Sequence, residues 1–423
     1  MREARREHRR EVERLRQGMA RPPEVREGER ARRLRATIEH ARRHSPYYRR
    51  LLDGLPADPL EAFRATPVTT RADLVASALS RATPAATGER RAVWRTSGSS
   101  GEPYTFEIDG WCTVRHTAQR ALVYLEAGVP RGARIAEVIA EGASEVFEDR
   151  GYPTFRRFVV NYRRVSGRLC ERVADVGPTL VFGNRSHLLQ IAEEARSASR
   201  RLSIPFVCSS SETLLERDKA TLEEAFGCAV CEVYGSAEAN NVAFYRPGEA
   251  EWTILEPRVW VEVLDGRGRP VRAGDVGEVV LTTLTEPAAP LIRYGSGDLA
   301  RVADRDGNGR GGMRLAALEG RSCDAIVDQR GCRVSFWALA ANGFWGRDEV
   351  ASRVRRWQIH QRRDRSLRVR LELVPGAECA AVAPLIRQFL APVVGGLPVR
   401  IESVARVHDA GPGKFRAVTS EVG

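Results

Sequence analysis

The sequence is almost free of lysine. Of its 67 Lys and Arg residues only Lys219 and Lys414 are lysine, a bias that replaces lysine by arginine wherever the two are interchangeable. A planar guanidinium cannot take the place of a compact ammonium at a site that needs a point charge. Lys414, in the glycine-rich turn GPGKFR, is therefore a functional candidate. Lys219 lies in the amphipathic stretch LLERDKATLEEAFG, which predicts a surface position on a helix.

Several other features are missing, and each absence excludes a class of protein. No stretch approaches about 18 apolar residues, so we expect no transmembrane helix. The N-terminus MREARREHRREVERLRQ has no apolar core and is not a secretory signal. The eight cysteines are scattered and form no disulfide framework, which indicates reduced thiols in a cytoplasmic protein. There is no GxSxG nucleophile elbow, and no histidine lies in a metal or nucleophile motif.

The positive charge is concentrated at the N-terminus. Residues 1–50 hold 17 Arg and 8 Glu, a net charge of +9, although the whole chain carries only +12. Acidic and basic residues recur there at i,i+4 spacing, which favours a helix. We expect residues 1–60 to form a basic helical arm that is solvated or packs against a subunit. That leaves a homodimer open, and a nucleic-acid arm is the less favoured alternative.

Residues 134–234 alternate short β-rich runs with amphipathic helical runs. The strands RIAEVIA, TLVFG, IPFVCSS and AVCEVYG follow one another in the way that parallel βαβ units require. Ligands of such sheets bind at the carboxyl ends of the strands, which here are GNRS, SSSET and YGSAE. From residue 258 the period-two runs RVWVEVLD and GEVVLTTL predict antiparallel sheet.

The chain is predicted to be an α/β protein of two domains. The first, residues 1–319, combines the parallel βαβ sheet with an antiparallel β subdomain. The second, residues 320–423, is a small α+β domain, and the boundary is expected at residues 320–324.

Five short motifs carry the chemistry. The segment from Thr96 to Gly101, TSGSSG, follows a strand, and its glycines and hydroxyls suit phosphate oxygens. YGSAE ends a parallel strand with an aromatic that can stack on a base and a carboxylate that can bind Mg²⁺. YGSGDL places Asp298 in a glycine-rich turn, and EGRSCD and GKFR follow it. Each motif alone also fits an ordinary turn.

In this order and spacing the five motifs resemble those of the adenylate-forming superfamily of acyl-CoA synthetases, carrier-protein adenylation domains and luciferases. ARRHSPYYRRLL, SSSETLLE and the short length are most similar to the phenylacetate–CoA ligase-like branch and its capsule-biosynthesis-type members. The resemblance spans about residues 30–420.

The resemblance implies a role for each matching residue. Its phosphate loop would consist of Thr96, Ser97, Gly98, Ser99, Ser100 and Gly101. Its strand-end motif would place Tyr234, with Gly235 and Ser236, against adenine, and Glu238 on Mg²⁺. Asp298 would accept the ribose hydroxyls, and Arg321 would contact ribose or phosphate.

The resemblance also implies a mobile C-terminal domain. That domain would deliver Lys414 as the adenylation lysine, and Cys323 stands where relatives have an Asp or Lys hinge residue. The acid pocket is expected near Asn184, Arg185, His187 and Glu212, whose polarity favours a substituted acid. His116 is a further candidate for substrate contact.

The implied reaction is ATP-dependent activation of a small carboxylic acid, aromatic or substituted, as an acyl-AMP with release of pyrophosphate. The acyl group would then pass to CoA or to a carrier-protein thiol. Two alternatives stay open. One is an unusual acid, including nitrite, with a non-thiol acceptor such as an amine. The other is a nucleotide-binding protein that has lost catalysis.

Overall fold

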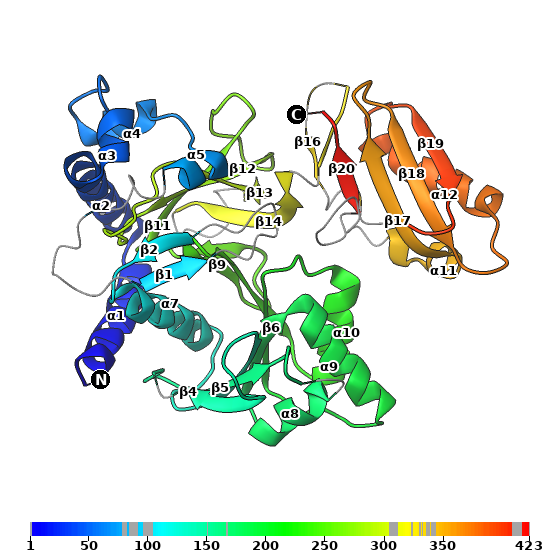
Figure 1. Cartoon of the computed structure of the whole chain (residues 1–423), viewed down its shortest axis with the longest axis horizontal. Coiled ribbons are helices and arrows are strands. Elements are labelled where there is room, and N and C mark those ends of the chain that lie inside the picture. The colour runs from blue at the N-terminus through cyan, green and yellow to red at the C-terminus, as the bar shows by residue number, and fades with distance from the viewer. Residues whose placement is uncertain are drawn as a thin grey trace.

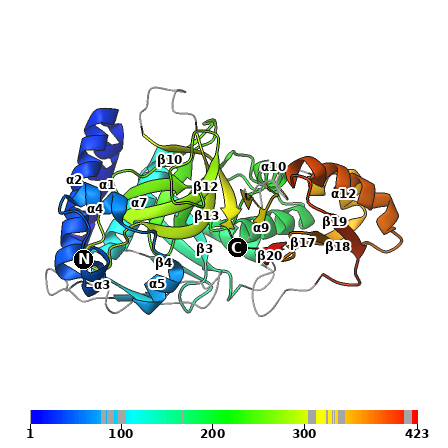
Figure 2. The same ribbon diagram turned by 90° about the horizontal axis from the view of Figure 1, so that it is seen from above.

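The computed structural model (Figure 1) describes most of the chain, namely residues 2–77, 83, 92–95, 105–149, 151–165, 168–303, 312–322, 325–329, 331, 333–335, 339, 344–407 and 417–422. Its helical N-terminus and its C-terminal unit lie at opposite ends of the molecule, as Figure 2 also shows. None of the helices in these ranges combines the length and the apolar character needed to cross a membrane.

The N-terminal segment is helical, as predicted. Its described helices are α1 (Arg2–Ala20), α2 (Pro23–His44), α3 (Pro46–Leu51), α4 (Pro59–Ala65) and α5 (Arg71–Ala76). The Arg-rich helix α1 is not fully solvated, because its Val12 and Leu15 are buried within the same chain against α7 (Cys112–Glu126). This packing gives the arm a structural role that its charge pattern did not reveal.

A twelve-stranded sheet forms the centre of the large domain. Its strands, in spatial order, are β11 (Val259–Leu264), β12 (Val276–Thr283), β13 (Tyr294–Val302), β14 (Arg314–Arg321), β10 (Trp252–Ile254), β9 (Asn240–Tyr245), β8 (Val230–Ser236), β7 (Phe206–Ser210), β6 (Leu180–Asn184), β3 (Arg134–Ile139), β5 (Arg156–Asn161) and β4 (Val146–Asp149). The neighbours from β8 to β5 run parallel, and the remaining pairs run antiparallel. The predicted parallel and antiparallel parts are thus one continuous sheet, joined where β9 pairs with β8.

Helices cover both faces of the parallel part. One face packs against α8 (Leu169–Val176), α9 (Arg185–Ser197) and α10 (Glu216–Phe226). The other packs against α7 and, through it, α1. Burial on both faces explains why these strands are nearly continuous apolar runs.

The hairpin of β1 (Ala92–Arg95) and β2 (Thr105–Ile108) is antiparallel and flanks the predicted phosphate loop. Residues Thr96–Gly101 themselves lie outside the described residues. The strand predicted before this segment is confirmed by β1.

The C-terminal unit has a hydrophobic core of its own. Its described elements are β15 (Ile326–Val327), β16 (Arg333–Val334), η3 (Phe344–Gly346), α11 (Asp348–Ala351), β17 (Val354–Gln361), β18 (Leu367–Leu373), α12 (Cys379–Val393), β19 (Val399–Ser403) and β20 (Val418–Ser420). The sheet β19-β18-β17-β20 packs against α12 through Val369, Ile386 and Leu390, among others. This is the small α+β unit that the sequence predicts, and it begins just after the end of β14.

Candidate active site

Two cavities meet at the carboxyl ends of the parallel strands. The smaller, of about 320 Å³, runs from the end of β7 toward β14, and the larger, of about 990 Å³, runs beneath α7 toward β3 and β5. Both are lined by the same junction residues, Ser210, Ser211, Gly235, Asp298 and Arg321. A ligand in one cavity can therefore touch a ligand in the other at this junction. Ser211 has a φ of 68°, a left-handed backbone conformation that is uncommon outside glycine and is enriched at functional sites.

Tyr234, Asp298 and Arg321 form one hydrogen-bonded group at the junction. The Tyr234 hydroxyl donates to Asp298 Oδ2 at 2.8 Å. Asp298 on β13 is paired in register with Arg321 on β14, and Arg321 Nε lies 3.3 Å from Asp298 Oδ1. Burial raises the pKa of Asp298, although the Arg321 charge opposes this shift. Residues of three separate motifs thus meet at the partly buried Asp298 carboxylate.

Two glycines of these motifs are required by the backbone. A Cβ at Gly235 would lie 2.3 Å from the carbonyl oxygen of Asn240, so the turn from β8 to β9 leaves no room for a side chain. Gly297 has a φ of 74°, which favours glycine beside Asp298.

Glu238 lines the larger cavity close to this group. The Tyr294 hydroxyl donates to Glu238 Oε1 at 3.3 Å, and Arg71 Nη1 lies 3.7 Å from the same oxygen. Its carboxylate is a hard oxygen donor facing a cavity, which is the ligand type that Mg²⁺ prefers. Glu238 would therefore offer one ligand oxygen to a magnesium ion.

Of the four residues predicted for the acid pocket, two line a cavity and two do not. Asn184 lines the larger cavity and Glu212 the smaller. Glu212 also accepts hydrogen bonds from the backbone N–H and hydroxyl of Ser186, at the first turn of α9. Arg185 is paired with Asp218 at 2.7 Å, and His187 stacks on Tyr162 with ring centroids 3.9 Å apart. Neither Arg185 nor His187 is among the described lining residues of the two cavities.

The amphipathic pattern of its helix predicts a surface position for Lys219, but the structure places this side chain elsewhere. It lines the smaller cavity, and its Nζ lies 4.4 Å from the centroid of the Tyr245 ring. Glu232 lines the same end, and burial raises its pKa to about 7. The scarcity of lysine would have marked Lys219, but the amphipathic pattern of its helix outweighed that signal. Lys414 and Cys323, the predicted catalytic lysine and hinge, lie outside the described residues.

A group of five charged side chains lies where the larger cavity passes beneath α7. We call it the Glu137 cluster; its members are Arg120, Glu137, Glu141, Asp149 and Arg157. Glu137, on β3, is fully buried and accepts hydrogen bonds from Arg120 Nη1 at 2.9 Å and Arg157 Nε at 2.8 Å. Burial alone would raise the pKa of Glu137, but the two guanidinium groups hold it below its ordinary value. The sequence reasoning missed this cluster, although a lone acid inside the apolar strand RIAEVIA was a usable signal.

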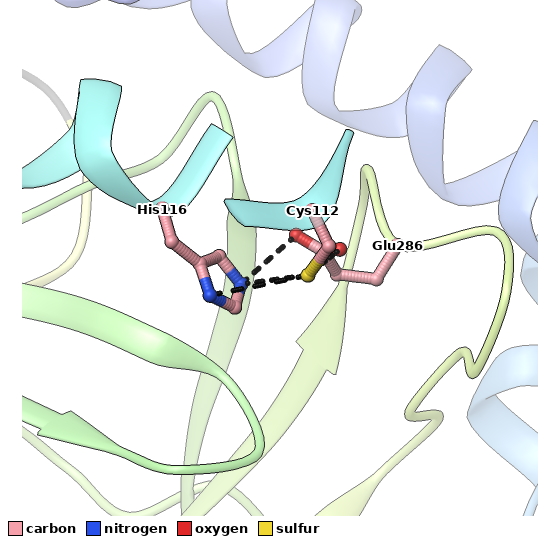
Figure 3. Close-up of side chains that lie close together, drawn as sticks. All are labelled: Cys112, His116 and Glu286. Carbon is pink, nitrogen blue, oxygen red and sulfur yellow. Dashed lines mark hydrogen bonds and ion pairs between the residues drawn. The ribbon is translucent and has the colours of Figure 1, made fainter. Parts of the chain in front are cut away.

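His116 also lines the larger cavity, where it belongs to a buried group with Cys112 and Glu286 (Figure 3). Cys112 Sγ lies 3.2 Å from both His116 Nε2 and Glu286 Oε2. Burial raises the pKa of the Cys112 thiol to about 11 and lowers that of His116 well below its ordinary value. Because Arg115 and Arg258 both pair with Glu286, positive charge already compensates this carboxylate. We interpret the group as a hydrogen-bonded anchor of α7 rather than as a metal site.

The chain was compared with known protein families and with individual proteins. No family profile matches the chain. It is similar to the phenylacetate-coenzyme A ligase of Thermus thermophilus, with 27% identity over 325 residues that cover 70% of each chain. The phenylacetate-coenzyme A ligase of Escherichia coli is 25% identical over 336 residues, covering 70% of this chain and 71% of the relative.

Solved structures agree in fold. An open conformation of 2-hydroxyisobutyryl-CoA ligase, in complex with 2-HIB-AMP and CoA, superposes with a TM-score of 0.73 at 20% identity, covering 93% of this chain and 92% of that one. An anthranilate CoA ligase in complex with anthranoyl-AMP gives a TM-score of 0.53 at 17% identity, over 77% of this chain and 64% of that one. The predicted resemblance to the phenylacetate–CoA ligase-like branch of the adenylate-forming enzymes is confirmed by these relatives.

In agreement with these relatives, the chain is an AMP-forming ligase. Three of the residues that the resemblance singles out meet at one carboxylate, since Tyr234 donates to Asp298 and Arg321 pairs with Asp298.

Proposed function

We propose that the protein activates a small carboxylic acid with ATP and transfers the acyl group to the thiol of CoA. In the first step a carboxylate oxygen attacks the α-phosphorus of ATP. The bond to the β-phosphate breaks, pyrophosphate leaves and an acyl-AMP forms. In the second step the thiol attacks the acyl carbonyl, AMP leaves and the thiol proton is released to solvent.

The observation that carries this proposal is the junction of the two cavities. A nucleotide in the smaller cavity and an acid in the larger one would meet at Ser211, Gly235 and Asp298. We assign the adenine to Tyr234 and the ribose hydroxyls to Asp298, with Arg321 beside them. This arrangement brings the α-phosphate toward the mouth of the acid cavity.

The residues act by position and charge. A carboxylic acid is already ionised at neutral pH, so the attacking group needs no general base. Holding the two substrates in one geometry removes much of the entropic barrier, and positive groups stabilise the charge that develops on the phosphate. We assign this electrostatic role to Lys414 and the phosphate contacts to Thr96–Gly101. Bound at Glu238, Mg²⁺ would supply neutralisation of phosphate charge.

ATP–pyrophosphate exchange over a panel of aryl and alkyl acids tests the first step without knowledge of the acceptor. We expect label to enter ATP only when the right acid is present. Lys414→Ala should lower exchange by about 10²–10³-fold, since a charge aimed at the transition state contributes that much. Lys414→Arg should not rescue it, because a planar fork differs from a point charge.

Two results would contradict the proposal. ATP binding without exchange for any acid would indicate a nucleotide-binding protein that has lost catalysis. Exchange that depends on nitrite, or product formation with an amine in place of CoA, would replace the proposed substrate or acceptor.

A further inference from the structure

The Glu137 cluster gives the acid cavity a polar wall. Arg120 projects from α7, Arg157 from β5, and Glu141 and Asp149 follow β3 and end β4. All four line the larger cavity. The buried Glu137 behind them fixes both guanidinium groups. An unsubstituted phenyl or alkyl group at this wall would leave these polar groups desolvated without new partners, which is unfavourable.

The two arginines of the cluster differ in how many of their N–H groups already donate to a partner. Each of the three side-chain nitrogens of Arg157 already donates to a carboxylate, since Nε, Nη1 and Nη2 bond Glu137, Asp149 and Glu141 at 2.8, 2.6 and 2.9 Å. Among the described residues, the Arg120 guanidinium has one hydrogen-bond partner, Glu137, which it reaches through Nη1; it also lies over the Phe182 ring, 5.2 Å from the ring centroid. Its side chain is 27% exposed. Arg120 thus presents further donors at the cavity wall, oriented by a buried carboxylate.

Two more groups at the same wall are only partly satisfied. Glu141 bonds Arg157 through Oε2 and is 53% exposed, so its other oxygen can accept a hydrogen bond. The Tyr152 hydroxyl is buried and has no hydrogen-bond partner within the described part of the chain. Tyr152 lines the larger cavity as well. The wall therefore combines a donor, an acceptor and an unpartnered hydroxyl.

The charge of the Glu137 cluster limits which substituent of the substrate can lie against it. The cluster holds two arginines and three carboxylates, a net charge of −1, which disfavours a second carboxylate on the substrate. An ammonium group has only donors, so it could pair with Glu141 but would leave the Arg120 donors without an acceptor. A neutral hydroxyl can accept from Arg120 and donate to Glu141, so it satisfies both without bringing in charge.

We infer that the activated acid carries a hydroxyl group remote from its carboxylate, and that Arg120 and Glu141 select for it. This inference rests on the proposed function and names its substrate class. Arg120 is then a specificity-determining residue of the acid cavity.

The test is ATP–pyrophosphate exchange with matched acids. One set comprises hydroxyphenylacetates, the corresponding tolylacetates and phenylacetate; a second comprises ω-hydroxyalkanoates and the methyl-terminated alkanoates of equal length. Carboxyl- and amino-substituted phenylacetates complete the panel. We expect kcat/KM for the best hydroxylated acid to exceed that of its methyl isostere by about 10²-fold, because a site built for a hydroxyl is left unpaired by the isostere.

Three variants assign this preference to a residue. Arg120→Met removes the donors and should bring the hydroxyl-to-methyl ratio close to one. Arg120→Lys keeps a positive charge beside Glu137 and so protects the fold. It should still lower the hydroxyl-to-methyl ratio about tenfold, because an ammonium that pairs with Glu137 lacks the further N–H donors that the guanidinium presents to the cavity. Arg196→Met, on the outer side of α9 and 76% exposed, is the matched control and should leave the ratio unchanged.

The outcomes separate the two proposals. Exchange that favours unsubstituted, amino- or carboxyl-substituted acids overturns the inference and leaves the proposed function standing. An unchanged ratio in both Arg120 variants overturns the role of Arg120. Exchange with no acid at all overturns the proposed function, and the inference falls with it.

Discussion

The Asp298 carboxylate contacts residues of two other sequence motifs, Tyr234 and Arg321. It accepts from Tyr234, pairs with Arg321 and receives support from Ser296, whose hydroxyl accepts from the Asp298 backbone N–H at 3.1 Å. Because these groups orient the partly buried carboxylate, we propose that it accepts hydrogen bonds from the two vicinal hydroxyls of the ribose.

Asp298→Asn tests this role. The amide keeps the size of the side chain but loses the charge and one acceptor, so KM for ATP should rise by about 10–100-fold, the cost of losing hydrogen bonds to a charged group. Steady-state exchange kinetics at varied ATP measure this effect. Tyr234→Phe is the control for the local hydrogen bond, and an equal KM in wild type and Asp298→Asn would contradict a ribose contact.

Glu238 carries a second prediction at the scale of one residue. Glu238→Gln removes the negative charge that we assign to Mg²⁺, so half-maximal exchange should require about tenfold more Mg²⁺, with an unchanged thermal midpoint. Glu278→Gln offers a comparison at another acid of the same cavity. If the Mg²⁺ dependence of Glu238→Gln matched that of wild type, the metal assignment would be wrong.

At the scale of elements, the Glu137 cluster ties α7 to β3, β5 and β4. Three described donors meet on one buried carboxylate, since Tyr124 of α7 also donates to Glu137, at 3.1 Å. Glu137→Gln leaves buried guanidinium charge without full compensation and should lower the free energy of unfolding by about 3 kcal/mol. Urea denaturation measures it. Glu148→Gln, in an exposed pair with Arg156, should cost less than about 1 kcal/mol.

The pH dependence of this contribution follows from the sign of the shift. The pKa of Glu137 is lower in the folded chain than in the unfolded one. Its stabilising contribution is therefore complete above the unfolded value of about 4.3 and is lost as the pH falls through the folded pKa. The Glu137→Gln variant should lack this acid-sensitive part, and parallel stability curves below about pH 4 would contradict the assignment.

The N-terminal helix gives a further prediction for an element. Leu15 of α1 is fully buried against α7, and Glu11 beside it lies 3.7 Å from the buried Arg258. Leu15→Ala should cost about 2–5 kcal/mol of unfolding free energy, whereas the exposed Arg16→Ala should cost less than about 0.5 kcal/mol. Equal stability of the two variants, with loss of activity only when nucleic acid is removed, would favour the nucleic-acid arm instead.

For the whole molecule, the order of elements could be predicted from periodicity and spacing, because apolar strands and amphipathic helices alternate along residues 134–234. The contacts that join distant segments could not. Val12 and Leu15 are buried by α7, more than 90 residues away in the sequence, and no local pattern indicates that partner. The roles of Tyr234, Asp298 and Arg321 followed from motif resemblance, whereas Arg120, Glu137 and Arg157 come together only through tertiary structure.

The candidate site adjoins the C-terminal unit along the chain. The end of β14, with Arg321, lies at the junction of the cavities and leads directly into the C-terminal unit. We propose that Lys414 of this unit reaches the same junction during activation of the acid, with Cys323 at the pivot.

The most direct test of the proposed reaction follows an oxygen atom. The enzyme is incubated with ATP, CoA and the acid identified by exchange, labelled with ¹⁸O in its carboxylate, and the products are weighed by mass spectrometry. Because a carboxylate oxygen bonds the α-phosphorus and stays there when the thiol takes the acyl group, we predict one ¹⁸O in each AMP and none in pyrophosphate. Unlabelled AMP, or ADP with labelled phosphate, would contradict activation through an acyl-AMP.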